Sequence, residues 1–207
     1  ISAIKSKKID KLYISTDCPT IKKVSKKYKA KIIERPKSIQ NPKTLTEDVL
    51  EHAHKYIKRD IGGIDKIKSY ILLYANGAFL NQNLIVQAIK KLDKNKKFDS
   101  CVGVVNADMF TPIRAKIINR KNEIKPFVNL NYFKNITSNR DSAGCAYFMD
   151  LSLQIIKPIC FEKMNGNQKP FLWLGQKILP FKKEFGGDID ATWQFTLLEN
   201  WLKKNFS

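Results

Sequence analysis

Two aspartates stand two residues apart near the end of the chain, in the segment Gly186-Gly187-Asp188-Ile189-Asp190. In an extended segment, residues i and i+2 face the same side, so both carboxylates can point at one ligand. Carboxylate oxygens suit a hard cation such as Mg²⁺ that also holds a polyphosphate. An alternative interpretation is that Asp190 caps a helix starting near Ala191, with Asp188 in a solvated turn. Taken alone the motif favours the cap, whereas the rest of the chain favours the metal site.

The elements that must position these carboxylates alternate between strand and helix. Strands are expected at residues 11–15, 31–34, 70–74, 100–105, 144–149 and 176–180, and helices at residues 20–28, 46–58, 82–93 and 191–205. This order predicts an α/β fold with a largely parallel sheet covered on both faces. Functional residues of such a sheet are expected at the carboxyl ends of its strands. Without a linker or repeat, residues 1–207 are expected to form a single domain.

Four finer expectations concern the packing of these elements. The apolar run at 70–74 predicts a central strand buried on both faces. Asn81 is the expected cap of the helix that follows it, and residues 115–126 are expected to form a hairpin. The closing helix is expected to turn one apolar set inward: Trp193, Leu197, Leu198, Trp201 and Leu202.

Composition excludes several classes of protein. The longest apolar runs are far shorter than the ~20 residues of a membrane span. The net charge of +19 could attract nucleic acid. However, the excess is almost entirely dispersed lysine without a recognisable reading motif, which argues against that partner. Cys18, Cys101, Cys145 and Cys160 lack metal-ligand spacing and are interpreted as reduced, mostly buried thiols. His52 and His54 are given no catalytic role.

Six segments, in this order, resemble the acylneuraminate cytidylyltransferase (CMP-N-acetylneuraminate synthetase) family. They are Ile14–Asp17, Ile33–Pro36, Thr46–Ala53, Ile71–Ala78, Ala143–Phe148 and Asp188–Asp190. The resemblance covers essentially the whole chain. It implies a three-layer α/β/α, Rossmann-like nucleotidyltransferase fold with a small dimerisation arm.

The implied reaction is transfer of CMP from CTP to the anomeric hydroxyl of a nonulosonic acid, with release of pyrophosphate and with Mg²⁺ as cofactor. The protein's share in such a transfer is charge compensation and accurate placement of the attacking oxygen. The resemblance assigns Asp188 and Asp190 to the metal. It points to no general base, and the number of metal ions is left open.

The substrate-binding residues implied by the resemblance are Asp17, Arg35, Tyr74, Asn76 and Arg140. Arg35 would contact the cytidine moiety or its phosphates through its planar fork, or would instead form a surface ion pair with Glu34 or Glu47. Asp17 would shape the nucleotide pocket or cap a helix. Arg140 would pair with the carboxylate of the sugar acid.

The chain departs from the family in two places. The glycine-rich triphosphate loop and the strand before it are not found, which predicts an N-terminally incomplete enzyme or a noncatalytic descendant. Tyr74 and Asn76 stand where many members carry Gln and Thr in the sugar site, so the acceptor sugar is not fixed by the sequence.

The family's members are commonly dimers with an extended arm, which residues 106–141 would supply through Phe110, Phe127, Leu130, Tyr132 and Phe133. Aromatic residues of this kind are enriched at interfaces, although they could instead pack within their own subunit. The leading hypothesis is thus a cytoplasmic, homodimeric cytidylyltransferase. The alternatives are a nucleotidyltransferase for another sugar or base, and a nucleotide-binding remnant without catalysis.

Overall fold

The computed structural model describes residues 1–139, 142 and 144–206. Its strands are β1 (Tyr13–Ser15), β2 (Lys31–Ile33), β3 (Tyr70–Leu72), β4 (Ser100–Asn106), β5 (Lys116–Ile118), β6 (Ile124–Pro126), β7 (Tyr147–Ile156) and β8 (Ile178–Lys183). Its α-helices are α1 (Ser2–Lys5), α2 (Pro19–Lys26), α3 (Thr46–Ile61), α4 (Gln82–Lys94), α5 (Ile159–Glu162) and α6 (Gln194–Phe206). Single 3₁₀ turns occupy Lys37–Ile39, Asp108–Phe110, Leu130–Tyr132 and Leu172–Leu174.

The main sheet has the strand order β3-β7-β4-β8. β4 and β8 are parallel, whereas β7 runs antiparallel to both β3 and β4, so three of the four strands share one direction. β1 and β2 form a separate parallel pair, in register from Tyr13 opposite Lys31 to Ser15 opposite Ile33. The α/β architecture predicted from the alternating pattern is confirmed.

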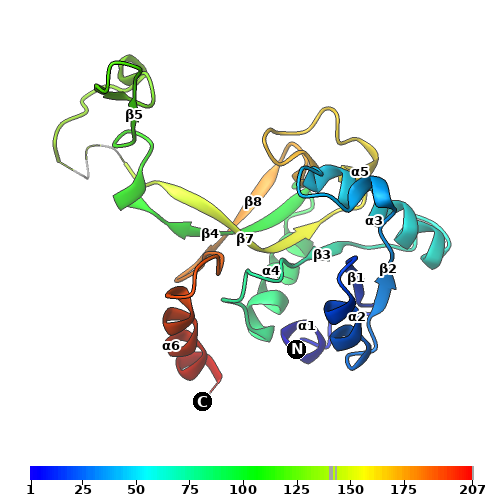
Figure 1. The fold of residues 1–207 in the computed structure, drawn as a ribbon. Coiled ribbons are helices and arrows are strands. Elements are labelled where there is room, and N and C mark those ends of the chain that lie inside the picture. The colour runs from blue at the N-terminus through cyan, green and yellow to red at the C-terminus, as the bar shows by residue number, and fades with distance from the viewer. Residues whose placement is uncertain (140–141, 143, 207) are drawn as a thin grey trace.

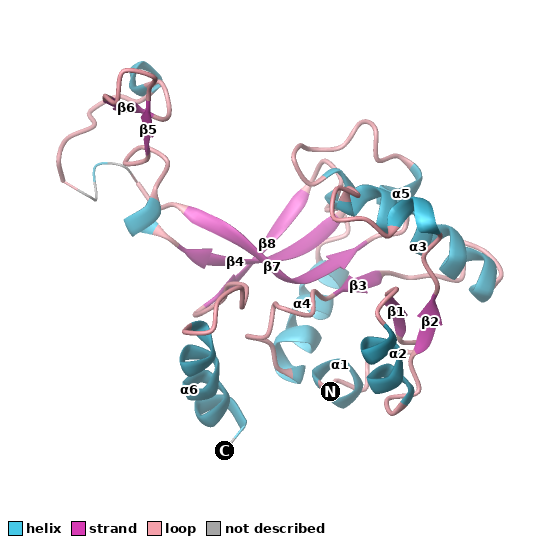
Figure 2. Cartoon of the chain, in the orientation of Figure 1, coloured by secondary structure: helices cyan, strands magenta, loops and turns pink. Residues whose placement is uncertain are grey.

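Helices cover both faces of the main sheet (Figures 1 and 2). On one face α4 buries Ile85, Ala88 and Leu92 against residues of β7, β4 and β8. On the other face α5 and the turn at Leu172–Leu174 pack against Val102 and Ile156, with Leu50 of α3 at the margin. Neighbouring strand residues therefore alternate between two apolar clusters, as the two-residue period of a strand requires. The result is three layers.

Several local expectations hold. The Asn81 side chain accepts a hydrogen bond from the backbone N–H of Leu84 at 3.0 Å and so caps α4. β5 and β6 form the expected antiparallel hairpin, with the turn residue Asn122 at φ +60°. All four cysteines are free, and burial raises the pKa of the Cys101 and Cys160 thiols to about 11 and about 12. Cys145 is exposed, contrary to the general expectation of burial.

Two packing expectations are wrong. β3 lies at an end of the main sheet and is half-buried, because it pairs with β7 alone; β4 and β7 are the deeply buried strands. Trp193, Leu197 and Leu202 are exposed. Trp193 precedes α6, and this helix extends from the end of β8 away from the sheet (Figure 1), so only a narrow strip around Trp201 reaches Phe79.

The predicted arm stands apart from the rest of the molecule. The β5–β6 hairpin projects from the end of β4 and β7 (Figure 1), and every residue of both strands is exposed. Of the five predicted anchors, Phe110, Phe127, Tyr132 and Phe133 are exposed and Leu130 is partly buried. Packing of the four aromatic anchors within their own subunit is therefore not what the structure shows.

No helix among the described residues is both long and apolar enough to cross a membrane.

Candidate active site

The two aspartates of the C-terminal motif lie in the loop between β8 and α6. The loop is held by Gln194, the first residue of α6, whose Oε1 accepts hydrogen bonds from the backbone N–H groups of Asp190 and Ala191, both at 2.6 Å. The same amide group donates from Nε2 to the carbonyl of Asp188 at 3.0 Å. Because α6 begins at Gln194 and not at Ala191, Asp190 does not occupy the expected cap position. Its side chain is available for another role.

Asn76 joins this loop to the loop after β3. The Asn76 carbonyl accepts from the Ile189 N–H at 2.9 Å, and the Asn76 side chain donates from Nδ2 to Asp190 Oδ1 at 3.1 Å. Residues that were predicted from separate motifs are thereby brought together at the carboxyl ends of β3 and β8. We call Asn76, Asp188 and Asp190 the carboxylate cluster.

The Asp188 carboxylate is the unusual member of the carboxylate cluster. Its Oδ1 atom is buried and makes no hydrogen bond to any residue that the structure describes. Burial raises the pKa of Asp188, the Asp190 and Asp150 carboxylates raise this pKa further, and the Lys183 ammonium lowers it. A buried, unpartnered carboxylate oxygen is energetically costly unless a ligand satisfies it. The arrangement therefore suits a cation.

Tyr74 lies beside the carboxylate cluster, in the loop that also carries Asn76. Burial raises the pKa of its phenol, and the Glu47 and Asp188 carboxylates act in the same direction. Hydrogen bonds with Gln154 and Thr46 oppose that rise in the pKa. The Tyr74 side chain thus lies between the start of α3 and the main sheet.

Asp17 and Arg35 form a second group, at the carboxyl ends of β1 and β2. The Arg35 guanidinium donates from Nε to Ser15 Oγ at 3.0 Å and from Nη2 to the Ser15 carbonyl at 2.8 Å. Its Nη1 lies 3.8 Å from Asp17 Oδ1. Of the two glutamates considered as partners of Arg35, Glu34 instead pairs with Lys22, and the carboxylate beside the Arg35 guanidinium is that of Asp17 and not that of Glu47. The N-cap of α2 is Cys18, so Asp17 does not cap that helix.

Arg140 lies outside the described residues.

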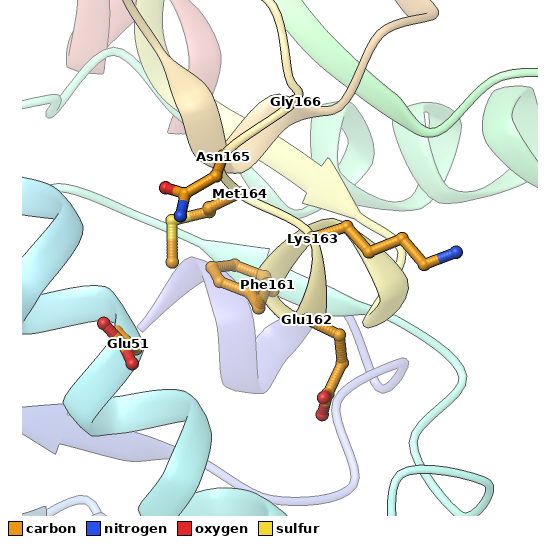
Figure 3. Close-up of a pocket in the computed structure, with 7 residues that line it drawn as sticks. All are labelled: Glu51, Phe161, Glu162, Lys163, Met164, Asn165 and Gly166. Atoms are coloured by element: carbon orange, nitrogen blue, oxygen red, sulfur yellow. The ribbon is translucent and has the colours of Figure 1, made fainter.

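The described cavities lie away from the carboxylate cluster. One of about 390 Å³ is lined by Glu51 of α3 and by residues Phe161–Gly166 of α5 and the loop after it (Figure 3). Another of about 550 Å³ lies between the first residues of β7 and the segment 168–171. Neither is lined by a predicted site residue. The first is flanked by buried His54, which contacts Tyr70 Oη and Glu162 Oε1, each at 2.9 Å, in a structural network.

Comparison with known proteins gives the family. A family model described as cytidylyltransferase matches residues 2–140. The chain belongs to the cytidylyltransferase family. It is therefore grouped with enzymes that transfer a nucleotidyl group. No curated protein matches its sequence.

Two solved structures support the same fold. One is a CMP:2-keto-3-deoxy-manno-octonic acid synthetase complexed with CTP, which is 10% identical, covers 99% of this chain and 86% of its own, and has a TM-score of 0.64. The other is described as a glucose-1-phosphate thymidylyltransferase from Bacillus anthracis in complex with sucrose, at 13% identity, 100% and 81% coverage and a TM-score of 0.55. Both are nucleotidyltransferase structures, and at these identities they establish the fold alone. The broad cytidylyltransferase assignment is thus confirmed, and the acylneuraminate subgroup stays a prediction.

The oxygen atoms of Asp188 and Asp190 are of the type that binds Mg²⁺. The orphaned Asp188 oxygen and the Asp190 carboxylate are hard oxygen ligands. Among the residues that the structure describes, no group of three or more His, Cys, Asp or Glu side chains could hold a metal ion. Two carboxylates completed by substrate phosphates and water are a common way of binding Mg²⁺.

Sequence reasoning missed Asp150, Ser152, Lys183 and Gln194. Lys183 Nζ pairs with Asp150 Oδ2 in the interior, where both side chains are almost completely buried. A signal existed for Lys183, because it continues the alternation of the inward-facing residues Leu179 and Phe181 along β8. The partnership of Lys183 with Asp150 could not be read from the chain because β7 and β8 lie on opposite sides of β4.

Proposed function

We propose that this cytidylyltransferase transfers CMP from CTP to the anomeric hydroxyl of a nonulosonic acid and releases pyrophosphate. The observation that carries the proposal is the carboxylate cluster, in which Asp188 presents a buried oxygen without a partner among the described residues and Asn76 donates a hydrogen bond to Asp190. The proposal includes a cytoplasmic location, where CTP is available.

In the proposed reaction Asp188 and Asp190 hold Mg²⁺. When bound, the ion neutralises charge on phosphate oxygens as the pyrophosphate leaves. Asp188 binds the ion as a carboxylate, and its raised pKa makes proton and metal compete for the same oxygens. Asn76 and Gln194 orient the two acids, through the Asp190 side chain and through the loop backbone respectively.

Arg35 is the proposed contact for the cytidine moiety or its phosphates. Two of its N–H groups are engaged by Ser15, and this fixes the plane of the guanidinium. The guanidinium has five donors, so others are available to a ligand. Asp17 Oδ1 lies 3.8 Å from Arg35 Nη1. Asp17 would orient the edge of the guanidinium that does not contact Ser15, and would shape the nucleotide pocket.

The acceptor would bind beside Tyr74 and Asn76, with Arg140 as the proposed partner of its carboxylate. A nonulosonic acid is proposed because the segments that resemble the acylneuraminate subgroup extend over both loops of the carboxylate cluster. Tyr74 replaces a smaller polar side chain of that subgroup and would narrow the range of accepted sugars.

A second copy of the chain is the proposed partner. The arm carries aromatic side chains that its own subunit leaves uncovered, among them Tyr132 at 82% exposure and Phe110 at 74%. An arm of this kind could close over the sugar site of a partner subunit and bury these rings there.

The test is Mg²⁺-dependent release of pyrophosphate from CTP, with single sugar acids offered in turn. The panel holds N-acetylneuraminate, bacterial nonulosonic acids and a 3-deoxy-octulosonic acid. The 207-residue chain is assayed beside its Asp190→Ala variant. Release with one nonulosonic acid that the substitution abolishes is the expected result. Release with the octulosonic acid alone would contradict the proposed acceptor, and folded protein that releases none with any acid would contradict the proposal and favour a nucleotide-binding module.

A further inference from the structure

A buried polar unit lies beneath the carboxylate cluster. Asp150 and Ser152 come from β7 and Lys183 from the last position of β8. Lys183 Nζ donates to Asp150 Oδ2 and, at 2.7 Å, to Ser152 Oγ. Ser152 in turn donates to Asp150 from Oγ at 2.9 Å and from its backbone N–H at 3.2 Å. Each of the three side chains therefore has a hydrogen-bond partner within the unit.

The strand is distorted where this unit forms. Between β4 and β7, Val104 pairs with Met149 but Val102 pairs with Gln154, so β7 carries extra residues at 150–153. Leu151 within this bulge has φ +53°, a region that non-glycine residues rarely adopt. Bulges and strained residues are concentrated near functional sites, where they re-aim side chains. Here the bulge places Asp150 and Ser152 toward Lys183.

Three glycines press against the unit from different elements. A Cβ atom added to Gly77 would lie 2.7 Å from Ser152 Cβ, and one added to Gly103 would lie 2.5 Å from Asp150 Oδ1. At Gly186 an added Cβ would overlap Asp150 Oδ2 more closely still. None of the three has positive φ, so close approach, not backbone conformation, calls for glycine there.

Two of these glycines belong to the loops that carry the carboxylate cluster. Gly77 follows Asn76, and Gly186 precedes Asp188 by two residues. The two loops are joined above the unit by the Ile189 N–H to Asn76 carbonyl bond. The unit is therefore a common support for both loops.

We infer that Asp150, Ser152 and Lys183 are positioning residues of the metal site. They fix where the Asn76 loop and the Asp188 loop lie on the sheet and how far apart the two loops are. The inference rests on the proposed function for its consequence, metal binding. For its geometry it rests on the contacts of the unit alone. An ion pair is suited to this task, because breaking it would leave an uncompensated buried charge.

The experiment uses the full chain and four proteins: wild type, Gly186→Ala, Asp150→Asn/Lys183→Met and Gly166→Ala. The double variant removes both charges together, which avoids the unpaired buried charge that could prevent folding. Gly166→Ala is the matched control, because an added Cβ there meets nothing within 4 Å. Circular dichroism confirms folding, amide hydrogen exchange reports the backbone of residues 186–191, and electron paramagnetic resonance titration reports Mn²⁺ affinity.

Faster exchange of the Ile189 amide in Gly186→Ala and in the double variant is expected, with the control unchanged. Mn²⁺ affinity should fall by about tenfold or more in the same two proteins, as for other outer partners of metal ligands. Wild-type exchange in folded Gly186→Ala would overturn the inference. Wild-type protein that binds no Mn²⁺ while its exchange still responds to these substitutions would instead contradict the proposed function and leave the positioning role standing.

Discussion

The carboxylate cluster and the arm differ in how their side chains are contacted by the rest of the subunit. In the cluster, Asn76 and Asp190 are fixed by hydrogen bonds between two loops, and these loops rest on a buried ion pair. In the arm, β5 and β6 have exposed residues throughout, and the rings of Phe127 and Tyr132 face solvent. Among the oxygens of the cluster, Asp188 Oδ1 is buried without a hydrogen bond to any described residue, whereas in the arm most large apolar side chains are exposed to solvent.

The difference indicates two kinds of incompleteness. A single buried polar atom is suited to a small, charged ligand, because one ion satisfies it. Several exposed aromatic rings are suited to a surface of comparable size, because each ring needs area to lose contact with water. The predictions below separate the two.

The largest effect is expected from Asp188→Asn. Loss of one carboxylate ligand should lower Mg²⁺-dependent pyrophosphate release by at least about 100-fold, since even outer partners of metal ligands cost 10–100-fold. Molecular mass in solution should stay the same. The control is Asp10→Asn, which changes an exposed aspartate; equal activity of the two variants would remove Asp188 from the site.

Phe133→Glu should act on the arm alone. A charge in the proposed interface should shift the protein from dimer to monomer, measured by light scattering, and Mn²⁺ affinity of the carboxylate cluster should remain. Phe195→Glu, at an exposed ring of α6, is the matched control and should leave the mass unchanged. A monomeric wild type would end the dimer hypothesis.

Gln194→Ala tests whether the Gln194 side chain holds the loop that carries Asp188 and Asp190. It removes the acceptor of two backbone N–H groups and the donor to the Asp188 carbonyl, and at about 1 kcal/mol for each bond it should lower the free energy of unfolding by about 2–3 kcal/mol. Mg²⁺ should be needed at a several-fold higher concentration for half-maximal activity. Chemical denaturation and a Mg²⁺ titration measure both; Gln87→Ala, at an exposed position of α4, is the control.

The smallest effect concerns pH and stability without metal. The pKa of Asp188 is higher in the folded state than in the unfolded state, so the folded state binds the proton more tightly. As the pH rises above the unfolded-state pKa of about 3.9, ionisation of Asp188 therefore lowers the free energy of unfolding. Asp188→Asn should therefore stabilise the metal-free protein at pH 7, and the gain should disappear below the unfolded pKa. Urea unfolding at the two pH values checks the sign; destabilisation at pH 7 would contradict it.

Patterns that depend on neighbours along the chain were predictable. The Asn81 cap, the hairpin around Asn122 and the Asp188–Asp190 pair all follow from short-range spacing. The meeting of Asn76 with Asp190 was predictable in outline, because both follow strands of one sheet.

What could not be predicted depends on strand order and on close packing. The Lys183–Asp150 pair joins strands separated by β4, and the bulge at Leu151 has no sequence signature of its own. Helical periodicity in α6 indicated an apolar face but not whether anything covers it, so the inward placement of Trp193, Leu197 and Leu202 was wrong. The apolar run at Tyr70 similarly could not indicate whether one or both edges of β3 are paired.

The central claim is cytidylyl transfer at the carboxylate cluster. The most direct measurement mixes CTP, UTP and ATP at equal concentration with Mg²⁺ and the sugar-acid panel, and identifies nucleotide–sugar products by mass spectrometry for wild type and Asp188→Asn. The account predicts a CMP ester of one acid from the wild type and a large loss of it in the variant. A UMP or AMP product, or a CMP product formed equally by Asp188→Asn, would contradict it.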